Sequence, residues 1–83
     1  MSSDYEAVVR TDGGIYRAFL LSPSTVCITE DGIEGIVDHL ELTPEYRAMP
    51  ADQMLIPTLI YWVYEMRRGE DITGTKLRRR GER

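Results

Sequence analysis

The sequence predicts a small α+β domain in which a three-stranded antiparallel meander is covered by one long apolar helix. Three observations lead to this expectation: a hairpin signature near the N-terminus, a β-branched stretch that follows it, and an apolar run at residues 54–66. The chain has 83 residues, which is the size of one domain. We expect a folded domain at residues 1–69 and a flexible, Arg-rich tail at residues 70–83, where few apolar side chains are available to offset the entropy of ordering.

A β-hairpin is the clearest local signal. The Asp-Gly pair at positions 12–13 is preferred in two-residue type I′ loops, and it lies between two apolar-rich runs. This loop predicts strands at residues 5–10 and 15–21. In the resulting register Val9 lies opposite Tyr16, and one face of the hairpin is apolar throughout.

A third strand and a first helix are expected next. Residues 25–29 (TVCIT) are rich in β-branched side chains and predict a strand beside the second one. Asp31 can cap a helix, and the apolar residues after it recur at helical spacing, which predicts a short acidic helix at residues 32–41. Two glycines weaken that helix by about 1 kcal/mol each relative to alanine, so it requires tertiary support.

The apolar run is expected to form the long helix. Thr-Pro-Glu at positions 43–45 predicts a helical turn at residues 44–49 before it. Pro50 suits a helix start, and Arg-Arg-Gly at positions 67–69 is typical of a cationic last turn followed by a glycine stop. Together these signals predict a helix at residues 51–68.

Two features leave the conformation of the apolar run open. Pro57 removes a hydrogen bond from a continuous helix, and residues 58–66 are rich enough in β-branched and aromatic side chains to form a strand. As a helix, the run is apolar on all sides, yet its thirteen residues are fewer than the roughly 20 that span a membrane. We therefore expect one side to pack on the sheet and the other to pack on a protein.

The charges are divided unevenly along the chain. The net charge is −4, but residues 1–66 hold three arginines against eleven acidic residues, whereas residues 67–83 hold seven basic residues against three acidic ones. Acidic residues recur at spacings of three and four around the expected acidic helix. We expect them to form one acidic face, made of Glu30, Glu34, Asp38, Glu41 and Glu45.

Three interpretations of this charge pattern remain open. The acidic face and the tail can both be solvated surface, the tail can dock on an acidic face, or it can bind nucleic-acid phosphates. Phosphate binding would be salt-sensitive and independent of base sequence, because no basic surface interleaved with aromatic residues is present to read bases. The candidate contacts to nucleic acid are Lys76, Arg78, Arg79 and Arg80.

The sequence contains no catalytic, cofactor-binding or metal-binding motif. Cys27 is the only cysteine, which excludes an intrachain disulfide and a Cys/His zinc site. A nucleophile pair of Cys27 and His39 is the one catalytic arrangement to consider, and a buried cysteine with a surface histidine is the simpler interpretation. We therefore expect no enzymatic activity and no cofactor. The acidic, polar start of the chain does not resemble a signal peptide, so we expect a cytoplasmic location.

These patterns favour a non-enzymatic interaction or assembly protein with no membrane partner. We expect it to self-associate, as a homo-oligomer, or to dock on a larger protein through the helix face that the sheet leaves uncovered. A phage or mobile-element origin, as a virion component or an inhibitor of a host complex, fits a small chain of this type. The alternative is a nucleic-acid-associated accessory protein that uses the basic tail. The residues expected at the protein interface are Ile60, Tyr61, Tyr64 and Met54.

Overall fold

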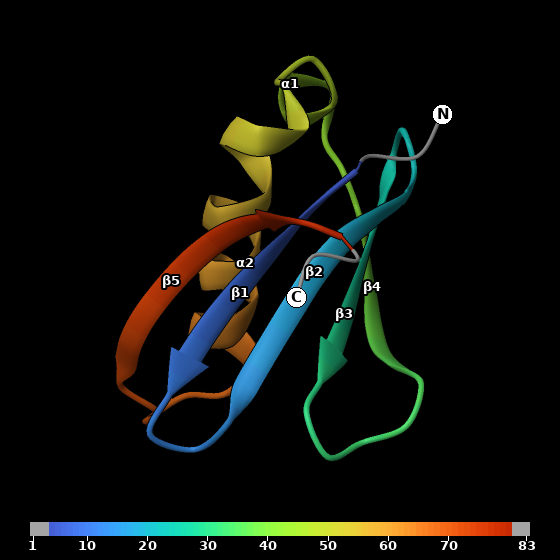
Figure 1. Ribbon diagram of the computed structural model, residues 1–83. Helices are drawn as coiled ribbons and strands as arrows, with labels where there is room; N and C mark the ends of the chain where they lie inside the picture. The colour runs from blue at the N-terminus through green and yellow to red at the C-terminus, as the bar shows by residue number, and fades with distance from the viewer. Residues whose placement is uncertain (1–3, 81–83) are drawn as a thin grey trace.

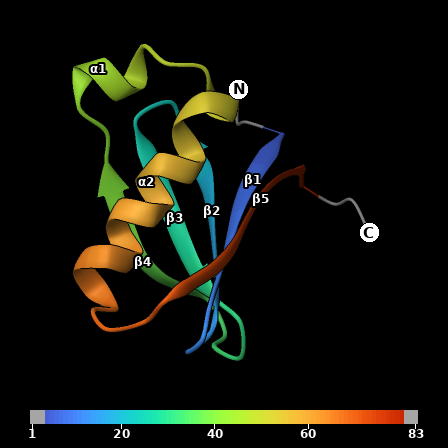
Figure 2. The same ribbon diagram turned by 90° about the vertical axis from the view of Figure 1, so that its left-hand side faces the viewer.

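The computed structural model describes residues 4–80 and has an α+β architecture, as the sequence predicts. The strands are β1 (Tyr5–Thr11), β2 (Ile15–Ser22), β3 (Thr25–Glu30), β4 (Ile36–Glu41) and β5 (Ile72–Arg79), and the helices are α1 (Pro44–Arg47) and α2 (Ala51–Met66). The five strands form one antiparallel sheet in the order β4-β3-β2-β1-β5 (Figure 1). Helix α2 lies across one face of this sheet, and no helix of the described chain lies on the other face (Figure 2).

The β1–β2 hairpin has the predicted register, although neither Asp12 nor Gly13 has the positive φ that the predicted type I′ loop requires. Val9 lies opposite Tyr16, and the loop closes with a hydrogen bond of 2.8 Å from the Thr11 amide to the Gly14 carbonyl. β3 follows as the third strand of the meander and pairs antiparallel with β2. This part of the fold is local in sequence, so hydrophobic alternation and one Asp-Gly turn suffice to predict it.

The prediction of an acidic helix at residues 32–41 is wrong, because this segment forms a loop followed by strand β4. Gly32 and Gly35 adopt φ values of 90° and 86°, a left-handed conformation that interrupts any helix through them. The residues after the second glycine then pair with β3, where His39 lies opposite Cys27. Pairing with this segment gives hydrogen-bond partners to the backbone groups along the free edge of β3. The free energy of these hydrogen bonds outweighs the weak helical preference of a segment with two glycines.

The prediction of a flexible tail at residues 70–83 is wrong over most of that range, because Ile72–Arg79 form β5, the fifth strand of the sheet. β5 pairs antiparallel with β1, so that Leu77 lies opposite Ala7 and packs against the core. The Nε of Arg78 lies 2.5 Å from a carboxylate oxygen of Glu6 on the neighbouring strand. Composition missed this strand because backbone hydrogen bonds to a sheet edge require no apolar side chain. The part of the predicted tail at residues 81–83 lies outside the described residues.

The apolar run folds as part of α2 and supplies five of the twelve residues of the core cluster. Pro57 lies inside the helix on its exposed side, and the helix ends two residues before the predicted boundary. No helix among residues 4–80 is both long and apolar enough to cross a membrane. The buried residues of α2 are Met54, Leu55, Thr58, Leu59, Trp62 and Val63, and those of the sheet beneath it are Ala7, Val9, Tyr16, Ala18, Val26 and Ile28.

A core substitution in α2 tests this packing. Leu59 is fully buried, so Leu59→Ala removes apolar contacts and leaves a cavity against the sheet. We expect the free energy of unfolding to fall by about 2–5 kcal/mol, measured by urea denaturation followed by circular dichroism. The control is Leu21→Ala in β2, where the side chain is 56% exposed and the expected change is below about 0.5 kcal/mol. Equal losses for the two variants would contradict this arrangement.

Candidate functional site

The outer side of α2 carries two exposed aromatic side chains. Tyr61 is 63% exposed and Tyr64 is 77% exposed, and both were expected at a protein interface from the sequence. Ile60 is half-buried and packs against the core, so only part of it is accessible. Met54 is 1% exposed, so the structure removes it from the predicted interface. The sequence assigned it wrongly because its helical position is close to the boundary between the two faces.

An apolar groove of about 290 Å³ lies beside Tyr61. It runs between α2 and the segment that joins the end of β4 to α1. Thr58 lies in this groove, is 92% buried, and its hydroxyl has no hydrogen-bond partner among residues 4–80. A buried hydroxyl without a partner is costly in a folded protein, and a ligand group that entered the groove would relieve that cost. The groove is lined by Leu40, Glu41, Leu42, Thr43, Tyr46, Thr58 and Tyr61.

The five acidic residues predicted to form one acidic face lie on different elements instead. Their predicted arrangement depended on the helix that the structure replaces with β4. Three of them are partnered by other elements: Glu30 forms an ion pair with Arg67, Asp38 accepts a hydrogen bond from Trp62, and Glu41 accepts one from Thr25. The other two are exposed, Glu34 in the loop before β4 and Glu45 in the first turn of α1.

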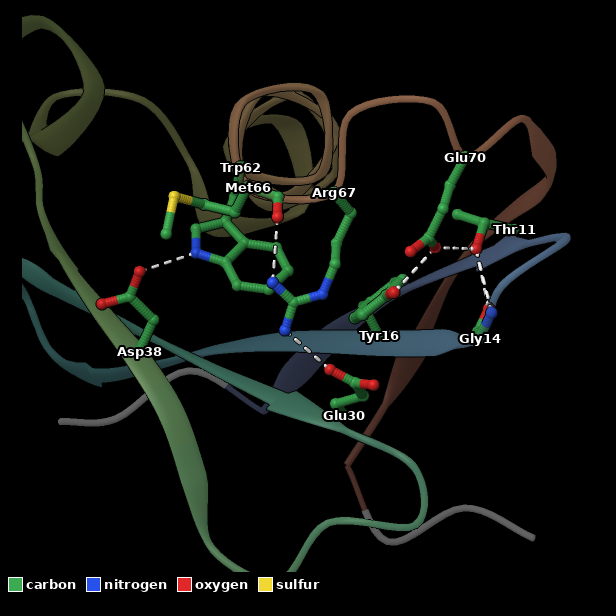
Figure 3. Close-up of polar contacts among 9 residues, drawn as sticks. All are labelled: Thr11, Gly14, Tyr16, Glu30, Asp38, Trp62, Met66, Arg67 and Glu70. Carbon is green, nitrogen blue, oxygen red and sulfur yellow. Dashed lines mark hydrogen bonds and ion pairs between the residues drawn. The ribbon is translucent and has the colours of Figure 1, made fainter.

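A polar network fastens the C-terminal end of α2 to the sheet (Figure 3). The Arg67 guanidinium carbon lies 4.9 Å from the centre of the Trp62 ring and 5.6 Å from that of Tyr16, and its Nη2 lies 2.9 Å from a Glu30 oxygen. The hydrogen bond to Glu30 raises the pKa of Arg67 above its ordinary value. On the other side of the Trp62 ring, Nε1 donates to an Asp38 oxygen at 2.7 Å. We call this group, with Glu70 and Thr11 described next, the helix-end network.

Glu70 extends the helix-end network to the β1–β2 hairpin. One of its oxygens accepts hydrogen bonds from the Tyr16 hydroxyl at 2.7 Å and from the Thr11 hydroxyl at 2.5 Å (Figure 3). The same Thr11 oxygen accepts the Gly14 amide at 3.0 Å, so the hairpin loop and the turn before β5 are held together. These hydroxyls lower the pKa of Glu70, whereas burial, followed by the hydrogen bond to Glu70, raises the pKa of Tyr16.

The chemistry of the helix-end network suits a structural role better than proton transfer. The pKa of Asp38 is lowered, first by the hydrogen bond from Trp62, and that of Glu70 is lowered by Thr11 and Tyr16. Both carboxyls are therefore held ionised at neutral pH and are poor proton donors. Among residues 4–80, no group of three or more His, Cys, Asp or Glu side chains is arranged to hold a metal ion.

Cys27 and His39 are brought together, but the thiol is not poised for nucleophilic attack. They lie directly opposite each other on β3 and β4. Cys27 is fully buried, and this burial raises the pKa of its thiol. A raised pKa leaves little thiolate at neutral pH, and the thiolate is the reactive form. The absence of enzymatic activity stays a prediction.

The four basic residues proposed from the sequence as nucleic-acid contacts lie in or directly after β5. By strand alternation, Lys76 and Arg78 lie on the sheet face that α2 leaves open, whereas Arg79 lies on the opposite side. The Arg80 guanidinium lies 4.1 Å from the centre of the Phe19 ring, which is also on the open face. Arg10 and Arg17 share this face, as the predicted hairpin register implies, and sequence reasoning missed that β5 brings Lys76 and Arg78 to the same face.

Comparison with known proteins identified no matching family model, no similar curated protein and no similar solved structure.

The helix-end network predicts an acid-sensitive contribution to stability from Glu70. Its folded-state pKa lies below the ordinary value of 4.5, so the ionised carboxylate stabilises the fold above that pH, and this contribution is lost as the pH falls through the folded-state pKa. We expect Glu70→Gln to lower the urea midpoint at neutral pH and to differ less from the wild type in acid. Glu34→Gln, which changes an exposed loop carboxylate, serves as the control and should follow the wild type at every pH. An equal deficit of Glu70→Gln in acid and at neutral pH would contradict the ionic role of this side chain.

Proposed function

We propose that this chain is a non-enzymatic interaction protein that associates with a second copy of itself through the outer side of α2. The proposed surface consists of Tyr61, Tyr64 and the apolar groove beside Tyr61. The observation that carries the proposal is the exposure of these two tyrosines, 63% and 77%, on a helix whose other side forms the core. Exposed tyrosines beside an apolar groove are typical of the centres of protein interfaces.

The groove gives this surface a place to anchor a partner side chain. It is lined mainly by apolar side chains, and its one buried polar group, the Thr58 hydroxyl, has no partner within the described chain. A side chain with an apolar body and a polar tip, such as tyrosine, fits both properties. Each copy presents Tyr61 and Tyr64 as such side chains.

The position of the groove at one edge of the sheet also supports pairing. β4 is the last strand on that side, so its outer backbone groups are not used by another strand of the described sheet. At the opposite edge, β5 carries Lys76, Arg78 and Arg79, the kind of charged residues that discourage edge-to-edge association. Association is therefore favoured on the β4 side. A two-fold dimer is the commonest way for two identical surfaces of this kind to be buried.

Substitution of the two tyrosines tests the proposed surface. We expect wild-type protein to associate as its concentration rises in sedimentation experiments, and the Tyr61→Ser/Tyr64→Ser variant to have a dissociation constant at least about tenfold higher, because two anchoring rings are removed. Both side chains are exposed, so the thermal unfolding midpoint measured in dilute solution should change little.

The matched control removes exposed apolar side chains elsewhere. Leu21→Ser/Ile33→Ser changes two residues that are 56% and 51% exposed and lie outside α2. This variant should associate like the wild type. A wild-type protein that stays monomeric at all concentrations, or a control variant that loses association as strongly as the tyrosine variant, would overturn the proposal.

A further inference from the structure

The face of the sheet opposite α2 carries a cluster of basic side chains from three adjacent strands. Strand pairing places Arg17 of β2 and Lys76 of β5 on either side of Val8 in β1. Arg10 lies two residues beyond Val8 and therefore on the same face, and Arg78 lies opposite Glu6. We call this cluster the basic face, and it consists of Arg10, Arg17, Lys76, Arg78 and, directly after β5, Arg80.

No described element covers the basic face. α2 packs on the other side of the sheet, and the ribbon leaves this side open (Figure 2). The surface is hollowed by a depression of about 270 Å³, which is lined by Val8, Arg10, Arg17, Gly74, Thr75, Lys76 and Arg78. Val8 is nevertheless 95% buried, which follows if the aliphatic parts of the neighbouring long side chains lie over it and direct their charged ends outward.

The positive charge of this face is only partly neutralised within the described chain. Arg78 pairs with Glu6 at 2.5 Å, and Arg17 pairs with Asp31. Arg10 and Lys76 form no ion pair with any residue in the range 4–80. The Nε of Arg17 is buried and has no acceptor there either. Four of the five cations therefore line the depression, and two of these four are balanced by carboxylates.

The positive charge of the basic face contrasts with the negative net charge of the whole chain. The whole protein has a net charge of −4, so the other surfaces are strongly acidic and repel polyanions. A polyanion that approaches is attracted only to the side where these cations gather.

We propose that the basic face binds the phosphate backbone of single-stranded nucleic acid without regard to base sequence. Alternate residues of a strand are about 6.7 Å apart and neighbouring strands about 4.8 Å apart, so a flexible phosphate chain can lie across several cations at once. A flat sheet face has no helix or ribbon to enter the grooves of a duplex, which favours a single strand. The contacts are made chiefly by Arg10, Arg17 and Lys76.

The basic face has too few aromatic side chains for base stacking to contribute much to binding. Phe19 is the one aromatic side chain on the open face of the described strands, and the Arg80 guanidinium already lies 4.1 Å from its ring centre. Base stacking therefore contributes little, and affinity comes from charge. Binding by charge alone weakens steeply with salt, with a slope of about −0.7 per neutralised phosphate for single strands, so three contacts predict a slope of about −2.

Fluorescence anisotropy with labelled single-stranded oligonucleotides tests the proposal. The probes are oligothymidylate, oligouridylate and a DNA duplex of the same length, at low ionic strength. We expect both single strands to bind with similar affinity and more tightly than the duplex. Arg10→Gln/Lys76→Gln should weaken single-strand binding by at least about tenfold and make the salt slope shallower by about 1.4 units, because two cations are lost.

The matched control carries the same change in charge away from the basic face. Arg47 at the end of α1 and Arg68 after α2 are both exposed, so Arg47→Gln/Arg68→Gln should bind the probes within about twofold of the wild type. Circular dichroism and the thermal midpoint of both variants check that the fold is intact.

Three results would overturn the proposal. The first is an undetectable interaction of the wild type with any probe at low salt. The second is an equal loss of binding in the basic-face variant and in the control. The third is competition by poly-glutamate as effective as that by unlabelled oligonucleotide, which would assign the face to an acidic polypeptide. None of these results depends on self-association through α2, because the two surfaces lie on opposite sides of the sheet.

Discussion

The packing of the apolar side of α2 on the sheet, which Arg67 closes at the end of the helix against Trp62 and Tyr16, is the interaction on which the rest of the structure depends. The guanidinium joins the end of α2 to β2 through the Tyr16 ring and to β3 through Glu30. A cation over aromatic rings contributes about 0.5–2 kcal/mol, depending on how far it is removed from water. The side of α2 that faces the sheet is decided by the burial of Leu55, Leu59 and Trp62 in the core, and Arg67 fastens the end of the helix in that orientation. Once Trp62 is held inward, Tyr61 and Tyr64 must point away from the core.

Because α2 covers only one face of the sheet, one face is apolar and buried and the other is basic and exposed to solvent. On one side, apolar strand residues meet the helix and form the only extensive core of the described chain. On the other, the strands present long basic side chains to solvent. The two proposed binding surfaces follow from this asymmetry: an aromatic surface on the outer side of the helix and a basic surface on the open side of the sheet. A protein that uses both could hold nucleic acid on each copy of an assembled pair.

The parts of the fold that could be predicted from sequence are those held by local signals. The register of the hairpin was predictable because a loop at Asp12 and Gly13 brings the apolar residues of both strands to one face. β4 was not, because Ile36, Val37 and Leu40 fit a helical stripe as well as a strand, and the decision is made by pairing with β3. β5 was not, because its stability comes from the edge of β1. The aromatic surface was recognised from the apolar run, whereas the basic face required the knowledge that β5 lies beside β1 and brings Lys76 to the side of Val8 opposite Arg17.

The most direct test of the account is to observe which side chains touch in the associated state. Mixing isotope-labelled and unlabelled protein and recording isotope-filtered nuclear Overhauser spectra detects contacts between copies only. We predict contacts from the ring protons of Tyr61 and Tyr64 to residues that line the groove, including Leu42 and Tyr46 of the other copy. Contacts confined to β5 or to the basic face, with none from these two tyrosines, would contradict it.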